Sequence, residues 1–248
     1  MTEHVFYRAI LFDVGGPLDL EFAWEIAVDS AIAAACGLEG IRLDQAAIEA
    51  ASERAVEAFA SDAYAHMIET LTGGDPATVE RVHRRVRSIT GGLDLFQLRP
   101  DVDGLLRRLG ERGLRLGIVA NQPAAIVPRL ERAGIAQFFA YTGLSGTTGL
   151  KKPDPRAFQA AAEALGATPA ECVMVGDRID NDIVPAKALG MAAILFRSGR
   201  HRRQRPRTPA EAPDATVADV PELEAAIAGL LEARRPFPSS DRSSSTPR

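Results

Sequence analysis

Three side chains with an acid or amide group stand where short apolar runs of this sequence end. Asp13 follows the run 9–12, Asn121 follows 116–120, and Asp177 comes shortly after 173–175. In an open parallel sheet, ligands bind outside the carboxyl ends of the strands. If these runs are strands of one sheet, the three residues are candidates for a common site.

Carboxylates are concentrated in the stretch 176–182, which holds Asp177, Asp180 and Asp182. The helix dipole favours carboxylates near the start of a helix, and this is a purely structural explanation. Several carboxylates gathered beside Asp13 would nevertheless repel one another unless a cation lay between them. Hard oxygen ligands suit Mg²⁺, which takes one or two carboxylates and keeps positions for water and phosphate. We therefore expect Mg²⁺ as the cofactor, bridging protein and phosphate.

A lysine pair precedes a proline-rich helix start. Lys151 and Lys152 are followed by Pro153 and Pro155, which restrict the backbone around them. A lysine side chain acts as a compact point charge for phosphate. A lysine considered alone is usually a solvated surface group, so only the neighbouring carboxylates give this pair a chemical meaning.

The elements that would position these residues alternate between two kinds. Short apolar runs at 9–12, 116–120, 138–142, 173–175 and 192–196 are typical of buried strands, and helical patterns separate most of them. Strands that alternate with helices indicate crossover units and a parallel sheet. The expected fold class is therefore α/β, with a three-layer Rossmann-like core.

One stretch interrupts the alternation. Residues 21–90 show only helical periodicity, at 22–35, 43–59, 63–71 and 78–89. We expect a helical cap subdomain inserted after the first strand. The expected division is a core of residues 1–20 and 96–234, a cap of residues 21–95, and a Ser-, Pro- and Arg-rich tail at 235–248 that is disordered.

Composition excludes several classes of protein. The apolar and charged fractions of 46% and 25% are those of an ordinary globular protein. The 29 basic and 33 acidic residues leave a net charge of −4, which offers no general attraction to nucleic acid or an anionic membrane. No apolar run approaches the roughly 18 residues that a transmembrane helix needs. We expect neither a nucleic-acid nor a membrane partner, and the sequence does not indicate an oligomeric state.

Two further features are the cysteines and an arginine-rich segment. Cys36 and Cys172 lie in apolar surroundings, and residues 1–8 lack the apolar segment of a secretory signal. We expect two buried thiols in a reducing, cytoplasmic setting. The segment 197–207 holds six arginines. Because it lacks interleaved aromatic residues, we expect a solvated loop and not a nucleic-acid contact.

Four pieces of sequence, in this order and spacing, carry a family resemblance. They are 12–18 (Phe-Asp-Val-Gly-Gly-Pro-Leu), 117–121 (Gly-Ile-Val-Ala-Asn), 152–158 (Lys-Pro-Asp-Pro-Arg-Ala-Phe) and 175–182 (Val-Gly-Asp-Arg-Ile-Asp-Asn-Asp). Together they resemble the haloacid dehalogenase-like hydrolase superfamily over about residues 7–231, in its phosphatase-like branch with a small helical cap. The resemblance implies a phosphatase for a small phosphorylated metabolite.

The resemblance also implies roles for individual residues. Asp13 is the implied nucleophile, which attacks phosphorus and forms an aspartyl-phosphate. The carboxylates of Asp13 and Asp177 and the backbone carbonyl of Gly15 are the implied Mg²⁺ ligands, and Asp182 supports them. Lys152, which directly precedes a proline as in the family, is the implied charge-neutralising residue.

Two positions depart from the family pattern. Phosphatases of this family carry a second Asp two residues after the nucleophile, as general acid and base, and this chain has Gly15 there. Such proton transfer is worth about 10²- to 10⁴-fold in rate. The Ser or Thr that binds phosphate at the end of the next strand is replaced by Ala120. The backbone N–H of Ala120 and the side chain of the neighbouring Asn121 are then the expected hydrogen-bond donors to the phosphate group.

These departures leave alternatives open. The chain is either an active phosphatase or a weakened or non-catalytic relative that binds or regulates. For a phosphatase, a good leaving group, the substrate itself or a carboxylate of the cap would compensate for Gly15. A 2-haloacid dehalogenase is disfavoured because such enzymes carry Tyr at this position and need no metal, while this chain keeps the motif from Asp177 to Asp182. Carbon–phosphorus cleavage is disfavoured because residues 21–90 contain no lysine for a Schiff base.

Overall fold

The computed structural model describes residues 6–233, and a parallel sheet of six strands lies at the centre of this part of the chain. The spatial order of the strands is β3-β2-β1-β4-β5-β6. The four residues of β1 and the five of β4 and of β5 are all buried, as in sheets covered by helices on both faces. The strands are β1 Ala9–Phe12, β2 Arg115–Ala120, β3 Phe139–Leu144, β4 Cys172–Gly176, β5 Ala192–Phe196 and β6 Ala215–Val217.

Five of these strands were predicted, and β6 was not. β6 has three residues at the edge of the sheet, and only the last of them is buried. A run this short and exposed has no apolar pattern for sequence analysis to detect.

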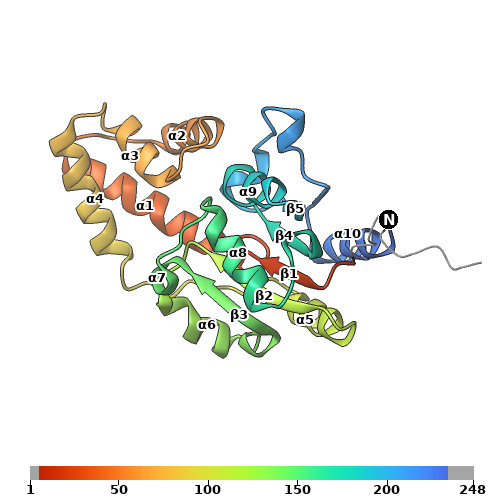
Figure 1. Ribbon diagram of the computed structural model, residues 1–248. Helices are drawn as coiled ribbons and strands as arrows, with labels where there is room; N and C mark the ends of the chain where they lie inside the picture. The colour runs from red at the N-terminus through yellow and green to blue at the C-terminus, as the bar shows by residue number, and fades with distance from the viewer. Residues whose placement is uncertain (1–5, 234–248) are drawn as a thin grey trace, which may run out of the picture.

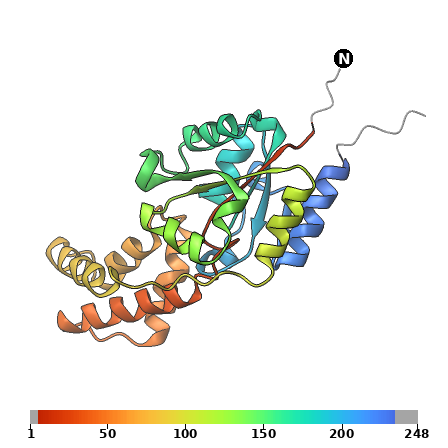
Figure 2. The same cartoon turned by 90° about the horizontal axis from the view of Figure 1, so that it is seen from below.

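Helices cover both faces of the sheet and form the outer two layers (Figure 2). On one face, α5 (Val102–Glu111), α6 (Val127–Arg132) and α10 (Val220–Ala233) contribute to one buried apolar cluster. On the other face, α8 (Pro155–Ala164) and α9 (Val184–Ala188) contribute to a second. The short helix α7 (Ser145–Thr148) follows β3. The predicted three-layer α/β core is confirmed.

The chain reverses its direction across the sheet at β1. It leaves β1 for β2 and β3 on one side and returns to the other side for β4, β5 and β6. The carboxyl ends of β1, β2 and β4 therefore flank the point where the strand order reverses. Crevices at such points are the usual ligand sites of parallel sheets.

Four helices form an insertion beside the sheet (Figure 1). We call α1 (Phe22–Leu38), α2 (Gln45–Glu57), α3 (Ala63–Leu71) and α4 (Pro76–Thr90) the helical insertion. It has its own buried cluster, which includes Ile32 and Met67. Its second, third and fourth helices begin at Asp44, Asp62 and Asp75, whose carboxylates accept hydrogen bonds from backbone N–H groups of the first turn. The four predicted helical segments are confirmed, with ends shifted by a few residues.

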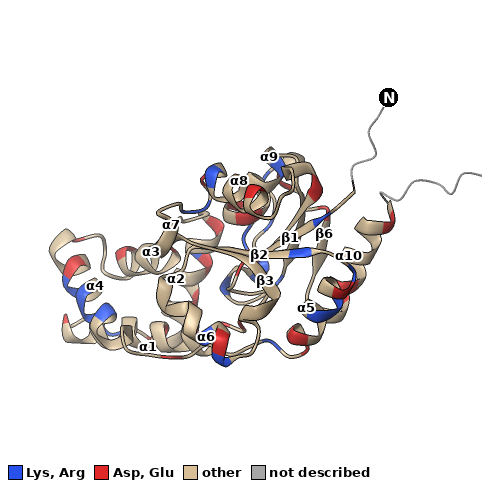
Figure 3. Ribbon diagram, turned by 60° about the horizontal axis from the view of Figure 1, so that its bottom comes forward, with Lys and Arg blue, Asp and Glu red and all other residues tan. Residues whose placement is uncertain are grey.

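Charged residues tie the two longest helices of the insertion together. Basic positions line part of α4 (Figure 3). Of these, Arg81 donates to Glu39, the residue directly after α1, over 2.7 and 2.9 Å, and Arg85 also pairs with Glu39. The end of α1 is thus held against α4.

The arginine-rich segment is only partly the solvated loop that the sequence suggested. The Arg200 side chain is 6% exposed and pairs with Asp29 of the insertion at 2.7 Å. Its guanidinium group also lies 4.9 Å from the ring centre of Tyr64. The prediction is wrong for Arg200, because the insertion folds over this segment and supplies partners that lie far away in the sequence.

Three remaining expectations have different outcomes. Cys36 and Cys172 are free and buried, as predicted, and burial raises the pKa of the Cys172 thiol to about 12. No helix between residues 6 and 233 has the length and apolar character needed to cross a bilayer. The predicted tail at 235–248 lies outside the described residues.

Candidate active site

Asp13 is the first residue after β1, and its two carboxylate oxygens differ in their surroundings. The Oδ1 atom accepts hydrogen bonds from the backbone N–H of Val14 at 2.8 Å and pairs with Nζ of Lys152 at 2.9 Å. No described residue donates a hydrogen bond to Oδ2. Burial raises the pKa of Asp13, against the opposing effect of Lys152, and the charge of Asp177 adds to the increase. The protein thus fixes one oxygen and leaves the other available for chemistry.

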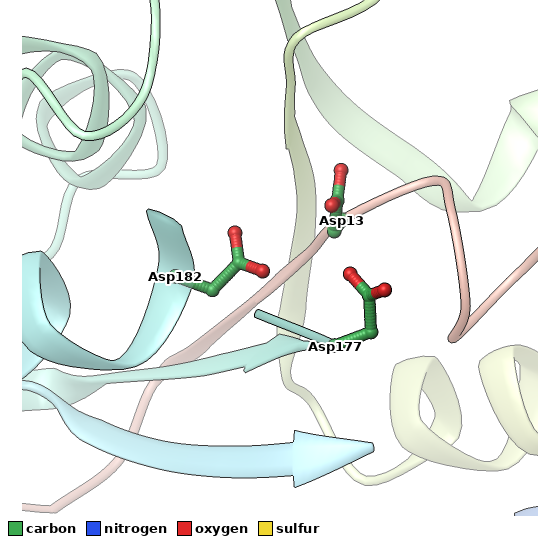
Figure 4. A group of neighbouring side chains, drawn as sticks. All are labelled: Asp13, Asp177 and Asp182. Atoms are coloured by element: carbon green, nitrogen blue, oxygen red, sulfur yellow. The ribbon is translucent and has the colours of Figure 1, made fainter. Parts of the chain in front are cut away.

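Three carboxyl groups converge beside the end of the sheet. Figure 4 shows those of Asp13, Asp177 and Asp182 turned toward a common space, and one oxygen of each lies within 4.8 Å of the others. Asp177 is 4% exposed and Asp182 is fully buried. A set of hard oxygen donors of this kind fits Mg²⁺.

The local backbone explains how Asp182 reaches this cluster. It lies in η4 (Ile179–Ile183), a single π-helical turn that begins three residues after the end of β4. Such turns are rare and occur often at functional sites. Gly176 leaves the necessary room, because a Cβ atom there would lie 2.5 Å from Cβ of Asp182.

The oxygens of Asp182 are both occupied by protein donors. Oδ1 accepts from Nζ of Lys152 at 2.6 Å, and Oδ2 accepts from the backbone N–H of Arg178 at 3.0 Å. Asp180 turns elsewhere, since it binds the side chains of Arg178 and Gln204. This geometry suits Asp182 for holding its neighbours in place, and Asp180 has no part in the cluster.

Lys152 lies at the centre of the site and is 2% exposed, while Lys151 is exposed. Burial opposes the charged ammonium form, but the carboxylates of Asp13 and Asp182 outweigh it and raise the pKa of Lys152. The ammonium group therefore stays charged beside the Asp13 carboxylate. Of the two adjacent lysines, the structure brings only Lys152 to the site.

Asn121 holds the Lys152 segment in position. Its Nδ2 atom donates to the Lys152 carbonyl at 2.9 Å, and its Oδ1 atom accepts from the Lys152 backbone N–H at 2.8 Å. Ala120, the last residue of β2, is 2% exposed. The predicted phosphate contacts at Ala120 and Asn121 stay predictions. In the structure, the Asn121 amide binds the backbone of Lys152.

Position 15 has no side chain, and a neighbouring carboxyl group occupies the space beside it. A Cβ atom on Gly15 would lie 2.6 Å from Cδ of Glu21 and would overlap Oε1. Burial raises the pKa of Glu21 well above its usual value, and the negative charges of Asp177 and Asp13 add to this effect. Glu21 is not among the predicted site residues, because its distance from Asp13 along the chain does not reveal that the backbone folds back.

Two further side chains reach the site without having been predicted. Nε of Arg99 donates to the Gly16 carbonyl at 2.8 Å and braces the loop after Asp13. His201, which is 14% exposed, has its Nδ1 atom 3.7 Å from an oxygen of Asp177. His201 belongs to the arginine-rich segment, whose approach to the site depends on the tertiary structure.

A cavity of about 730 Å³ lies between the insertion and the arginine-rich segment. Its wall includes none of the converging aspartates, and its charged residues are of both signs: Glu25, Asp29, Glu49, Glu53, Glu57, Arg200, Arg202 and Arg203. The candidate active site is therefore the cluster at the end of the sheet and not this cavity.

Comparison with known proteins finds a matching family model and similar phosphatases. A family model described as a haloacid dehalogenase-like hydrolase matches residues 7–190. A phosphoglycolate phosphatase of Xanthomonas campestris pv. campestris is 30% identical over 76% of this chain and 82% of its own length. A glyceraldehyde 3-phosphate phosphatase of Methanopyrus kandleri is 38% identical over 50% of this chain and 54% of its own length. The chain thus spans about half the length of this second relative.

A solved structure has the same fold. It is described as a predicted phosphoglycolate phosphatase from Haemophilus somnus, and it superposes with a TM-score of 0.69 at 20% identity, covering 93% of this chain and 99% of its own. At this identity the likeness concerns the fold alone.

Proposed function

The chain belongs to the haloacid dehalogenase-like hydrolases, and we propose that it is a Mg²⁺-dependent phosphatase for a small phosphorylated metabolite. The observation that carries the proposal is the state of Asp13. One of its oxygens is held by Val14 and Lys152, and the other accepts no hydrogen bond from any residue within 6–233. The names of the relatives, which are phosphatases of phosphoglycolate and glyceraldehyde 3-phosphate, support the substrate class.

In this proposal, Oδ2 of Asp13 attacks phosphorus and an aspartyl-phosphate forms. Lys152 opposes the effect of burial on the pKa of Asp13 and holds its carboxylate in place, and the charge of Lys152 offsets the negative charge of the transferring group. Asp182 and Asn121 hold Lys152 through its ammonium group and its backbone. Water then hydrolyses the aspartyl-phosphate, which restores the free carboxylate.

The carboxylates of Asp13 and Asp177 and the carbonyl of Gly15 would hold Mg²⁺, and Asp182 would support them. The fit rests on the three carboxylate oxygens that lie within 4.8 Å of one another. When bound, Mg²⁺ supplies positive charge that stabilises the phosphoryl group during transfer.

We also propose the division into a core of residues 1–20 and 96–234 and a cap of residues 21–95. Separate buried clusters in the insertion and on the two faces of the sheet support it. The two free, buried cysteines support the cytoplasm as the setting we propose.

Phosphate release measures this function directly. The purified chain is assayed with Mg²⁺ on a panel of acyl, aryl and alkyl phosphates, beside the Asp13→Asn variant. We expect metal-dependent release that Asp13→Asn abolishes, and a covalent phosphate on Asp13 that can be trapped. No release from any substrate, together with Mg²⁺-dependent phosphate binding, would instead identify a non-catalytic binding relative.

A further inference from the structure

The Glu21 carboxyl group occupies the space into which a side chain at position 15 would extend. A Cβ atom on Gly15 would lie 2.6 Å from Cδ of Glu21, a separation that real Cβ atoms essentially never show. The carboxyl of an aspartate at position 15 would lie one bond beyond that Cβ atom. Building on the proposed function, we propose that Glu21 is the general acid and base of the reaction, in place of the aspartate absent from position 15.

The loop between the two residues is held by several hydrogen bonds. The backbone N–H groups of Leu18 and Asp19 donate to the Val14 carbonyl at 3.2 and 2.9 Å, and that of Gly16 donates to the Asp19 carbonyl at 3.1 Å. The Glu21 N–H donates to Oδ1 of Asp19 at 3.2 Å. The position of Glu21 beside Gly15 is therefore built into the fold of this loop.

The backbone of Glu21 itself is unusual. Its φ of 56° lies in the left-handed region, which a residue with a side chain adopts only when the surroundings require it. Glu21 precedes α1, yet its side chain makes no hydrogen bond that caps this helix, in contrast to the aspartates that cap α2, α3 and α4. The loop thus places the Glu21 carboxyl beside Gly15, where it does not cap α1.

The Glu21 carboxyl also has no competing partner in the protein. No described residue forms a hydrogen bond or ion pair with it. On its far side lies Gly199, where a Cβ atom would come within 3.6 Å of Oε2. Glu25, one turn further along α1, is instead engaged by the backbone N–H of Arg200 at 2.5 Å. Of these two carboxyl groups, only that of Glu21 is free to exchange a proton with substrate or water.

The two half-reactions balance with this residue. In the first, Oδ2 of Asp13 bonds to phosphorus, the bond from phosphorus to the ester oxygen breaks, and the Glu21 carboxyl gives its proton to that oxygen, so that an alcohol leaves. In the second, the Glu21 carboxylate takes a proton from a water molecule whose oxygen bonds to phosphorus. The bond between phosphorus and Asp13 then breaks, inorganic phosphate leaves, and both carboxyl groups regain their starting forms.

Leaving-group dependence tests this role, because a good leaving group needs no proton. The Glu21→Gln variant is compared with the wild type in the first turnover of p-nitrophenyl phosphate and of an alkyl phosphate such as glycerol phosphate. We expect about 10²- to 10⁴-fold slower alcohol release from the alkyl ester. We expect a near-normal burst of p-nitrophenol, followed by slow turnover and accumulation of phosphorylated Asp13.

Two other variants separate this role from its rivals. Glu25→Gln is the matched control, since a glutamine oxygen still accepts the hydrogen bond from Arg200, and we expect both first-turnover rates to stay near wild type. His201→Asn tests the imidazole that lies beside Asp177. This variant should not slow the alkyl ester selectively relative to p-nitrophenyl phosphate. The assignment would be overturned if Glu21→Gln slowed both esters equally, or if His201→Asn slowed the alkyl ester selectively instead. Either result would leave the phosphatase proposal intact.

A second test moves the carboxyl group from one residue to the other. Gly15→Asp alone should impair the enzyme, because its Cβ collides with Glu21. Glu21→Ala alone should slow the alkyl ester, and Gly15→Asp with Glu21→Ala should recover most of that loss. A double variant no faster than Glu21→Ala would contradict the inference. A wild-type chain without phosphatase activity would overturn the proposed function and this inference together.

Discussion

Lys152 is a buried cation whose ammonium group is shared by two buried carboxylates. Its side chain is 1% exposed and lies 2.9 Å from Asp13 and 2.6 Å from Asp182. The arrangement costs desolvation energy, which the close pairing offsets only while all three groups are present. A buried pairing of this kind adds little net stability, but removal of one partner leaves the others uncompensated.

Lys152→Met tests this coupling. We expect phosphatase activity of the folded protein to fall at least about 100-fold, because a charge that stabilises the transition state is lost. We expect the free energy of unfolding to fall by about 3–5 kcal/mol, because two buried carboxylates lose their partner. Initial rates and urea unfolding measure the two effects. Lys151→Met is the matched control, and a similar loss there would show that the wrong lysine has been identified.

At the scale of secondary-structure elements, the helical insertion depends on a few charged contacts at helix ends. Glu39 follows α1 and binds two arginines of α4. The hydrogen bonds from Arg81 and Arg85 lower the pKa of Glu39 from its usual value of 4.5. The link therefore exists only while this carboxyl is ionised.

The Glu39 link predicts a pH dependence of stability. A carboxyl whose pKa is lower in the folded state contributes stability above the unfolded value of 4.5, and this stability is lost as the pH falls through the folded value. Glu39→Gln should therefore destabilise the protein near neutral pH and make little difference well below 4.5. Urea unfolding of the wild type and Glu39→Gln, from neutral pH to well below 4.5, measures the difference in their free energies of unfolding. If this difference in free energy persisted in acid, the link between Glu39 and α4 would not be ionic.

On the scale of the whole molecule, the insertion and the core meet through the arginine-rich segment. Arg200 binds Asp29 and Ser52 of the insertion and lies over the Tyr64 ring. Nearby, Arg178, which follows β4, donates to the carbonyl of Ala60 at 3.0 Å. These contacts hold the insertion beside the sheet, near the candidate active site.

Arg200→Met should loosen the insertion from the core. We expect a loss of about 2 kcal/mol in the free energy of unfolding, since charge-assisted hydrogen bonds of a buried side chain disappear. Arg203→Met is the matched control, because Arg203 is 70% exposed where it pairs with Glu53, and it should cost less than about 1 kcal/mol. Hydrogen exchange in α1–α3 should rise only for Arg200→Met. Equal protection in both variants would show that Arg200 does not hold the insertion.

Metal removal is predicted to act on activity and stability together. A chelator should abolish phosphate release, and saturating Mg²⁺ at about 100 times its dissociation constant should stabilise the fold by about 2.7 kcal/mol. Thermal unfolding with and without Mg²⁺ measures the shift. Asp177→Asn should remove it, and Asp180→Asn should retain it, because Asp180 pairs with Arg178 and Gln204. A Mg²⁺ shift that survives Asp177→Asn would place the ion elsewhere.

The sequence by itself determined the features that depend on local pattern. Apolar runs marked five of the six strands, helical periodicity marked the insertion, and the ends of strands marked Asp13 and Asp177. These predictions succeed because strand and helix periods are written into neighbouring residues, and because parallel strands bring their carboxyl ends to one edge.

Only the tertiary structure decided which other side chains reach that edge. Glu21 fills the space beside Gly15 because a hydrogen-bonded loop folds back on itself, and Arg200 is buried because the insertion covers it. No spacing in the sequence encodes either approach. Both depend on the path of the backbone in space, which the packing of the insertion against the core determines.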